Sequence, residues 1–271
     1  MCISTQNWSK MILCSRKTQT MKKFISAPFG NYIKTKKTIS VSGSWTIEKR
    51  TGRIVQIAKT LRYTKRGWVN KIGLRNPGIE KGIPQHEDGH VLSIAGIEKD
   101  DWIKFSNKIP DNFNLEINMS CPNIDEHYTG GIETFDPTSR EWFIGKISPL
   151  TTFKELEYFI NVLKFKQIHA CNTLPVEKGG LSGKELIPYT TKFITHIKNN
   201  YPDRELIVVC AWPSPFINLD FVDRVYKEGM TPYFYQDYVS GKDSLLFKHE
   251  PYFTTDHIHG NKSLIENWCE L

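Results

Sequence analysis

Three side chains that can take part in chemistry gather where one strand-like segment ends. Apolar and polar residues alternate over 115–120, which predicts a strand with one buried face, and the segment then stops at Cys-Pro-Asn. Asn118, Cys121 and Asn123 lie in this short stretch. A cysteine can accept a proton as its thiolate, and an asparagine offers both a donor and an acceptor. The stretch is therefore a candidate site for ligand binding and proton transfer.

Further polar residues follow other strand-like segments or lie in insertions beside them. Asparagine side chains suit a planar ligand with alternating C=O and N–H groups, such as a pyrimidine, and a lysine can stabilise an anion. Taken singly, an asparagine at a strand end is most often a turn residue, a cysteine is most often structural and a lysine is most often solvated. The interpretation as a ligand site therefore rests on these residues occurring together and in this order along the chain. The side chains expected at one end of the fold are Asn70, Asn118, Cys121, Asn123, Lys146, Asn172 and Ser182.

A glycine-rich stretch, GGLSG at 179–183, is predicted to be a loop that leads into a helix. The backbone N–H groups of such a loop can hold a phosphate at a helix start. Taken alone, the same sequence is a flexible loop about as often as it is a phosphate site.

The elements that must position these residues alternate between strands and helices. Helical spacing over 98–108, 151–164, 184–200 and 217–229 predicts crossover helices, and parallel strands joined by such helices place their carboxyl ends at one mouth. We therefore predict an α/β fold, a (β/α)8 TIM barrel with some crossover helices trimmed. A doubly wound open sheet is the alternative, but no GxGxxG follows the first strand. The predicted strands are 24–29, 38–43, 90–96, 114–120, 142–148, 167–173, 205–211 and 231–237.

Domain organisation is expected to be simple. Residues 21–271 are predicted to form a single barrel domain, in which 44–89 is an irregular insertion and 121–141 is a long loop. Residues 1–20 are polar and basic, and are expected to be a disordered extension or not translated, since Met21 is an alternative start. A weak organellar transit segment is the other reading of 1–20. The C-terminal stretch 263–271 is predicted to be a short helix.

Composition narrows the class of protein. The 271 residues carry a net charge of +7, which favours an anionic ligand or a lysine-rich solvated surface. No zinc-finger spacing, RNP motif or basic helix is present, so we expect no nucleic-acid partner. No apolar run approaches the roughly 18–20 residues that span a bilayer, so we expect no membrane partner. The six cysteines form no CxxC motif, which is typical of a reducing compartment, and we expect a cytoplasmic protein with no metal site.

Taken together, these motifs resemble one known family, the dihydroorotate dehydrogenases. The resemblance rests on blocks that run in family order from about residue 26 to about 200. They are GSWTIEKRTGR, GWVNKIGLRNPGI, LSIAG, LEINMSCPN, GKISP and NTLPVEKGGLSGKELIPYTTKFI. The ordered set is far more specific than any single motif in it.

The resemblance implies an FMN-dependent (β/α)8 barrel that oxidises dihydroorotate to orotate in pyrimidine biosynthesis. Cys121 would be the general base and Lys146 would lie beside the FMN ring. A cysteine base without a membrane-binding segment resembles the soluble class, which passes electrons to fumarate or, through a partner, to NAD, and which is often a homodimer. The implied substrate-binding residues are Asn70, Gly73, Leu74, Asn118, Asn123, Asn172 and Thr173. The implied cofactor-binding residues are Ser44, Asn118, Lys146, Gly180, Ser182 and Gly183.

The sequence departs from the family where the phosphate of FMN would bind. The segment 208–216, VVCAWPSPF, lacks the expected glycine turn, and 233–243 offers only Gly241. The usual lysine near the end of the second strand has no clear match. Two alternatives therefore stay open beside the active dehydrogenase. One is a related flavoenzyme with another substrate, and the other is a flavin-free homologue that binds a pyrimidine-like ligand or a protein.

Overall fold

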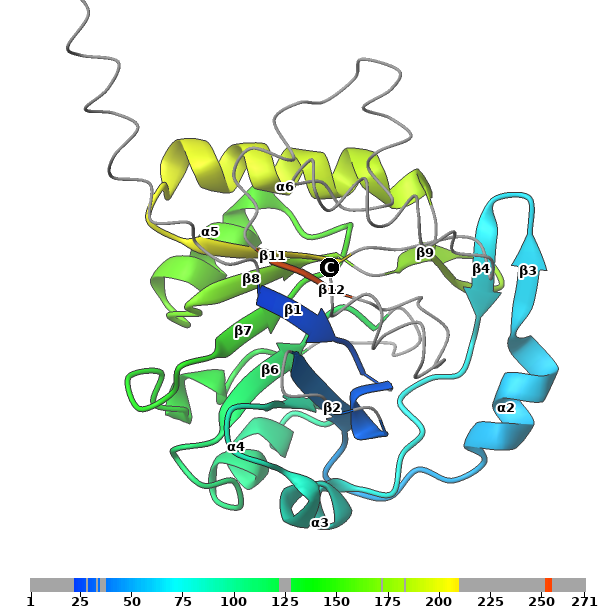
Figure 1. Cartoon of the computed structure of the whole chain (residues 1–271), viewed down its shortest axis with the longest axis horizontal. Coiled ribbons are helices and arrows are strands. Elements are labelled where there is room, and N and C mark those ends of the chain that lie inside the picture. The colour runs from blue at the N-terminus through cyan, green and yellow to red at the C-terminus, as the bar shows by residue number, and fades with distance from the viewer. Residues whose placement is uncertain are drawn as a thin grey trace, which may run out of the picture.

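A ring of parallel strands forms the centre of the protein. The structure, a computed structural model, describes residues 22–27, 29–32, 34, 38–121, 128–171, 173–182, 184–209 and 252–254. The strands hydrogen-bond in the order β1-β12-β11-β8-β7-β6-β5-β2, and β2 pairs with β1 again (Figure 1). The predicted α/β class is thereby confirmed. The strands are β1 (Lys22–Ile25), β2 (Ile39–Trp45), β5 (Val91–Ile94), β6 (Asn114–Asn118), β7 (Phe143–Lys146), β8 (Gln167–Ala170), β11 (Glu205–Val209) and β12 (Tyr252–Thr254).

The last strand of the ring differs from the sequence prediction. Strand β12 pairs with β11 on one side and with β1 on the other, so it occupies the place that we had assigned to 231–237. That assignment was wrong, and 231–237 itself lies outside the described residues. The two segments read almost alike, PYFY at 232–235 and PYFT at 251–254. Because the two segments have nearly the same sequence, the local pattern does not show which of them pairs with the first strand.

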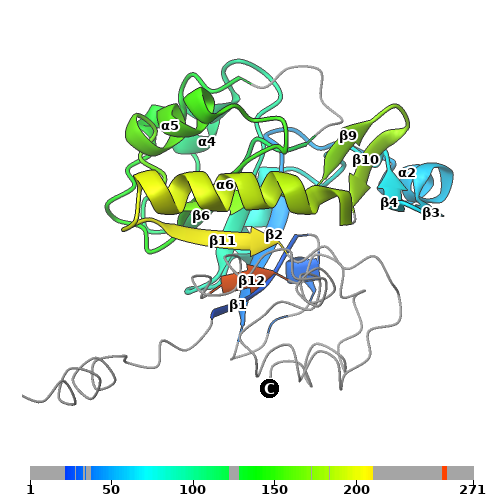
Figure 2. The ribbon, with the colours of Figure 1, turned by 90° about the horizontal axis from the view of Figure 1, so that it is seen from above.

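Helices cover the outside of the ring. Helix α3 (Ile79–Gly82) leads into the 3-10 turn η2 (Ile83–Gln85), and α4 (Asp101–Ser106), α5 (Phe153–Asn161) and α6 (Ile187–Asn200) follow β5, β7 and β8 along the chain. Figure 2 shows α6 lying along β11. The helices expected at 98–108, 151–164 and 184–200 are confirmed, and those at 217–229 and 263–271 lie outside the described residues. No helix in the part of the chain that the structure describes is long and apolar enough to cross a membrane.

Two crossovers are short, as predicted. Between β1 and β2 the described residues contain only the 3-10 turn η1 (Phe29–Asn31), and between β6 and β7 they contain only η3 (Ile132–Thr134). Where a full helix does form, its start is specified locally. The Thr152 side chain accepts a hydrogen bond from the Glu155 backbone N–H, and the Glu155 side chain accepts one from the Thr152 backbone. This capping box fixes the start of α5.

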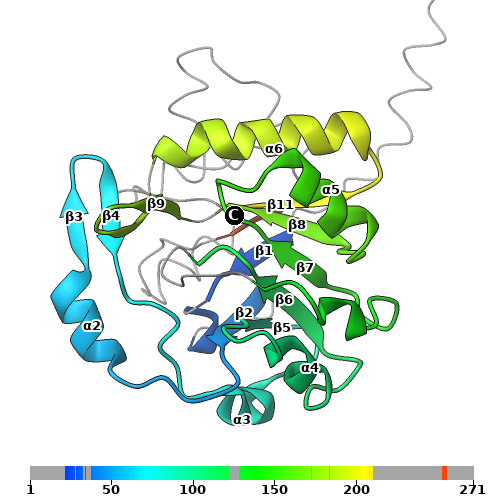
Figure 3. The same cartoon turned by 180° about the vertical axis from the view of Figure 1, so that it is seen from behind.

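A second, antiparallel sheet lies beside the ring and corrects two predictions. Its order is β3-β4-β10-β9, and helix α2 precedes it in the chain. Figures 1 and 3 show α2, β3 and β4 standing away from the ring strands. The insertion 44–89 is thus not irregular, and the GGLSG stretch forms a strand through Ser182 and not a loop. The bounds are α2 (Arg53–Thr60), β3 (Arg62–Thr64), β4 (Gly67–Asn70), β9 (Leu174–Val176), β10 (Gly179–Ser182) and the turn η4 (Lys184–Leu186).

Both faces of β6 are buried, and this differs from the one buried face that we predicted. Leu115 and Ile117 pack in the large apolar cluster that also contains Trp102 and Phe105 of α4. Glu116 and Asn118 are equally buried, on the face that alternation turns the other way. In a ring covered by helices, one strand face meets the helices and the other meets the interior. A polar side chain on the inner face therefore marks the interior and not the solvent.

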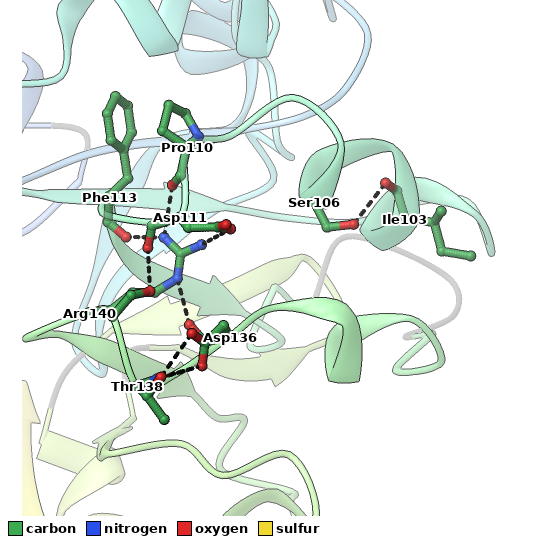
Figure 4. Close-up of polar contacts among 9 residues, drawn as sticks. Ile103, Ser106, Pro110, Asp111, Phe113, Asp136, Thr138 and Arg140 are labelled. Carbon is green, nitrogen blue, oxygen red and sulfur yellow. Dashed lines mark hydrogen bonds and ion pairs between the residues drawn. The ribbon is translucent and has the colours of Figure 1, made fainter.

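One buried arginine ties together the two loops that lead into β6 and β7 (Figure 4). The Arg140 guanidinium donates from Nε to the Asp136 carbonyl oxygen at 3.1 Å. Its Nη1 donates to the carbonyls of Pro110, at 3.2 Å, and Phe113. Its Nη2 lies 3.7 Å from Asp111 Oδ1, and the side chain is fully buried. Because one buried, charged guanidinium donates to three loop carbonyls at once, this residue ties together the two loops that precede β6 and β7.

We expect Arg140→Met to lower the free energy of unfolding by about 2–4 kcal/mol, because three loop carbonyls lose the charged donor that joins the two loops. Urea denaturation followed by tryptophan fluorescence measures the loss. The control is Lys99→Met, which removes the same charge at an exposed position and should change the value by less than about 0.5 kcal/mol. Equal losses for the two variants would contradict this role of Arg140.

Candidate functional site

A cavity of about 940 Å³ opens at the carboxyl ends of β2, β6 and β7. Functional groups of parallel rings collect at this end, since each strand places its last residue there. Strand β6 ends at Asn118 and β7 at Lys146, and these two residues are partners in the β6–β7 register. The predicted site residues that line the cavity are Ser44, Asn70, Gly73, Leu74, Asn118, Cys121, Lys146, Thr173 and Ser182.

The remaining predicted site residues are not placed in the cavity lining. Gly180 lies within β10, where it is opposite Asn70 in β4 and Pro175 in β9, so it sits in a strand ladder and not in a phosphate-binding loop. Asn123, Asn172 and Gly183 lie outside the described residues. The structure therefore brings together the residues at the ends of the strands, and it corrects the setting of the glycine-rich stretch.

Hydrogen bonds fix the orientation of Asn118 on the cavity floor. Its Oδ1 accepts from the backbone N–H of Ser120 at 3.0 Å and from the Ser120 hydroxyl at 2.8 Å. Its Nδ2 donates to Ser44 Oγ at 2.8 Å. The amide is thus held from both ends. Both acceptor positions of Oδ1 are used by Ser120, and the second N–H of Nδ2 is available to a ligand.

The bond to Ser44 begins a directed chain of hydrogen bonds into the ring. Ser44 Oγ lies 2.7 Å from Ser93 Oγ, and the Ser93 hydroxyl donates to Glu116 Oε1 at 2.8 Å. Since the Ser93 proton is used on the carboxylate, the proton between the two serines belongs to Ser44. Every donor from Asn118 onward therefore points toward Glu116. Hydrogen bonds aligned in this way polarise and strengthen one another.

A histidine completes the surroundings of the carboxylate. His169 Nδ1 lies 2.7 Å from Glu116 Oε2, and because an ionised carboxylate only accepts, Nδ1 carries the proton. Both side chains are 2% exposed. Burial alone would raise the pKa of Glu116, but the charges of Lys146 and His169, with hydrogen bonds from His169 and Ser93, hold that pKa down at about 2. The buried carboxyl group is therefore ionised.

The rim of the cavity is built by the second sheet. Strand β10 pairs with β4 so that Gly180 lies opposite Asn70 and Ser182 opposite Trp68. The pairing brings Asn70 and Ser182, from distant parts of the chain, to the same cavity wall. An exposed two-point ion pair supports the pairing, because Arg66 Nε and Nη2 donate to the two carboxylate oxygens of Glu185 at 2.6 and 2.5 Å.

Asn76 holds the loop that carries Gly73 and Leu74. Its Oδ1 accepts from the backbone N–H groups of Thr46, at 3.2 Å, and Gly78, at 2.9 Å. Its Nδ2 donates to the Leu74 carbonyl at 2.8 Å. The side chain is buried, so it joins this loop to the residue after β2 through bonds shielded from water. Gly73 itself has φ +64, a conformation in which a side chain is unfavourable.

Electrostatically, the described lining is basic. It contains four cationic side chains near the rim, Lys49, Arg50, Arg53 and Arg75, in addition to Lys146 on the floor, and it contains no aspartate or glutamate. Field lines in a cleft lined by one sign of charge concentrate at its mouth and attract ions of the opposite sign. This arrangement favours an anionic ligand.

Two cysteines near this end of the ring have different surroundings. Cys121 follows β6, is partly exposed and lines the cavity. Cys171 follows β8 and is buried, and burial raises the pKa of its thiol to about 12 although a hydrogen bond with Thr190 opposes the shift. The buried thiol of Cys171 is therefore not suited to proton transfer near neutral pH.

Sequence reasoning missed the residues that support the site. Ser93, Glu116 and His169 were not proposed, although Glu116 stands two positions before Asn118 and therefore shares its strand face. That spacing is the signal that could have identified Glu116. Asn76 and the basic rim lie in the insertion 44–89, whose internal structure the sequence pattern did not show.

Comparison with known proteins finds partial relatives. The chain is 39% identical over 79 residues to dihydroorotate dehydrogenase B (NAD(+)), catalytic subunit, of Shouchella clausii, covering 26% of this chain and 25% of the relative. It is 30% identical over 114 residues to dihydroorotate dehydrogenase A (fumarate) of Lactiplantibacillus plantarum, covering 37% of each. It is 34% identical over 106 residues to dihydroorotate dehydrogenase B (NAD(+)), catalytic subunit, of Bacillus thuringiensis, covering 35% and 33%.

These matches span between a quarter and just over a third of the length of the relatives. No family model matches the chain.

The close approach of β10 to β4 gives a test of the rim. A Cβ at Gly179, where φ is +128, would lie 2.1 Å from the Asn70 carbonyl oxygen. We expect Gly179→Ala to lower the free energy of unfolding by about 2 kcal/mol or more and to speed hydrogen exchange in β4. The control is Gly130→Ala, since nothing lies within 4 Å of its Cβ position. Unchanged exchange in β4 would show that the strands are not in this contact.

The buried carboxylate gives a test by pH. The pKa of Glu116 is about 2 when folded against 4.5 ordinarily, so the unfolded chain takes up a proton first as the pH falls. The stabilisation is present above about pH 4.5 and is lost as the pH falls through about 2. Urea midpoints across this window should decline less steeply in Glu116→Gln than in the unaltered chain. Parallel declines would mean that Glu116 is not the group responsible.

Proposed function

This chain is a relative of the dihydroorotate dehydrogenases, and from that premise we propose that it oxidises dihydroorotate to orotate with FMN as cofactor. The observation that carries the proposal is the gathering of Cys121, Asn118, Asn70 and Lys146 around one cavity. A general base, amide groups for a planar ring and a buried cation are the groups that this oxidation needs.

The chain's own residues have distinct roles in the proposed reaction. Cys121 removes the proton from C5 of dihydroorotate, and its partly exposed place in the cavity lining suits this role. Asn118, held by Ser44 and Ser120, presents a fixed donor to the polar edge of the substrate. Asn70 faces the same cavity from the rim. The basic rim attracts the substrate carboxylate.

The described residues fit the ring end of FMN. Lys146 and Asn118 are buried on the floor, and the cavity of about 940 Å³ is within the range of roughly 300–1,000 Å³ for cofactor sites. Lys146, Asn118, Ser44 and Ser182 would hold the cofactor, which when bound supplies the acceptor for the hydride from C6. The segments in which the sequence departs from the family, 210–216 and 233–243, lie outside the described residues.

The remaining predictions extend this proposal. We propose that the closed order of parallel strands is a complete (β/α)8 barrel and that 21–271 is one domain. The strand order and the helices that follow β5, β7 and β8 support this. Asn123, Asn172 and Gly183 keep their proposed roles at the mouth, and homodimer formation stays a prediction from the resemblance.

An absorbance spectrum of the purified protein, with FMN titrated in, tests the proposal. Flavin absorbance that bleaches on addition of dihydroorotate, with orotate identified by mass spectrometry, is the expected result. Cys121→Ala should keep the colour and slow the bleaching by roughly 10²–10⁴-fold. The matched control is Cys171→Ala, which removes a buried thiol outside the cavity lining and should still bleach.

Each other outcome contradicts the proposal in a different way. A protein that takes up no FMN favours the flavin-free homologue. A bound flavin that dihydroorotate does not bleach favours a related flavoenzyme with another substrate. Bleaching that persists unchanged in Cys121→Ala would remove Cys121 from the role of general base.

A further inference from the structure

Glu116 has no role in the proposed reaction, yet it is buried and charged immediately below the site. It stands two residues before Asn118 in β6, so the two side chains share the inner face of the strand. It contacts Ser93 in β5 and His169 in β8, and β7 lies between β6 and β8. A contact that passes over β7 crosses the interior of the ring. In β7, Lys146 is the register partner of Asn118 in β6 and of His169 in β8, so it lies next to both ends of this contact.

Lys146 needs a counter-charge because it too is buried. Its side chain is 4% exposed, and an isolated ammonium group in such a place is strongly disfavoured. The titratable groups that face it among the described residues are Glu116 from β6, His169 and Cys171 from β8, and Cys121 beyond β6. Cys171 is a neutral thiol, whereas Glu116 is an ionised carboxylate.

We infer that Glu116 is the counter-charge of Lys146 in the buried site. Glu116 is thus a positioning residue that acts through Lys146. Ser93 and His169 hold the carboxylate in place through hydrogen bonds of 2.8 and 2.7 Å. Any effect of this charge pair on a bound flavin rests on the proposed function. The pairing of Glu116 with Lys146 does not.

Two features of the structure support the inference. The attraction of Lys146 is one of the causes that keep the pKa of Glu116 low despite complete burial. The other is the direction of the hydrogen bonds, which run from Asn118 through Ser44 and Ser93 toward the carboxylate. Donors aligned in this way fit a permanent negative charge at Glu116 better than a neutral acid, which would need an acceptor for its own proton.

The alkaline stability of the cofactor-free protein tests the pairing. In Glu116→Gln the Lys146 ammonium loses its counter-charge and gives up its proton at lower pH than in the unfolded chain. The unfolded state then binds more protons, so stability rises with pH. Between about pH 7 and about pH 10, the unfolding equilibrium constant of this variant should fall by up to roughly tenfold per pH unit, relative to the unaltered chain.

Three further variants make the result specific. The double variant Glu116→Gln with Lys146→Met should lose the rise, because the group that titrates is gone. Glu116→Asp should restore the profile of the unaltered chain, since it keeps the charge. Glu80→Gln, which removes an exposed carboxylate on α3, should leave the profile unchanged.

The outcomes are separable from those of the flavin experiment. A Glu116→Gln profile parallel to that of the unaltered chain, or a rise that persists in the double variant, would overturn the inference whether or not FMN binds. Failure to bind FMN would contradict the proposed function and leave this test in force. If Glu116→Gln does not fold, recovery of folding in the double variant supports the pairing. A double variant that stays unfolded while Lys146→Met folds overturns it.

Discussion

The ionised carboxylate of Glu116 inside the strand ring is the constraint on which the site depends. A buried charge is tolerated only where donors and an opposite charge surround it. Ser93 and His169 donate directly to the carboxylate, and Ser44 donates to Ser93. The orientation of Asn118 follows, because its Nδ2 must donate to Ser44. The polar character of the cavity floor is therefore a consequence of one charge below it.

The rim of the cavity, which carries Asn70 and Ser182, is held by interactions other than those of the Glu116 carboxylate. Asn70 and Ser182 reach the cavity because β4 and β10, which are distant in sequence, pair in one antiparallel sheet. Asn76 then fixes the following loop to the end of β2. These contacts involve backbone ladders, the neutral side chain of Asn76 and the exposed Arg66–Glu185 ion pair, so they do not involve the buried charges in the ring. Floor and rim are thus specified independently, the first by strand ends and the second by insertions.

Much of the ring could be predicted from the sequence, because its strands and helices have clear local periods. Asn118 and Lys146 were placed at one mouth by the rule that parallel strands end together. The strand β10 was missed because a glycine-rich run is typical of a loop, and only pairing with β4 makes it a strand. Glu116 was missed because alternation indicates a polar face without telling whether that face meets water or the ring interior.

The floor and the rim of the cavity are built separately. One cavity can therefore both attract an anion and hold the groups for proton transfer and ring binding in fixed directions. Long-range attraction needs net charge but tolerates mobile side chains. The insertion cations that line the cavity, Lys49, Arg50, Arg53 and Arg75, are exposed or half-exposed, so solvent reaches them. Proton transfer and ring binding need fixed directions, which only buried and fully bonded groups provide. Glu116 offsets the charge of Lys146 on the floor, so the positive field that a ligand first meets comes from the rim.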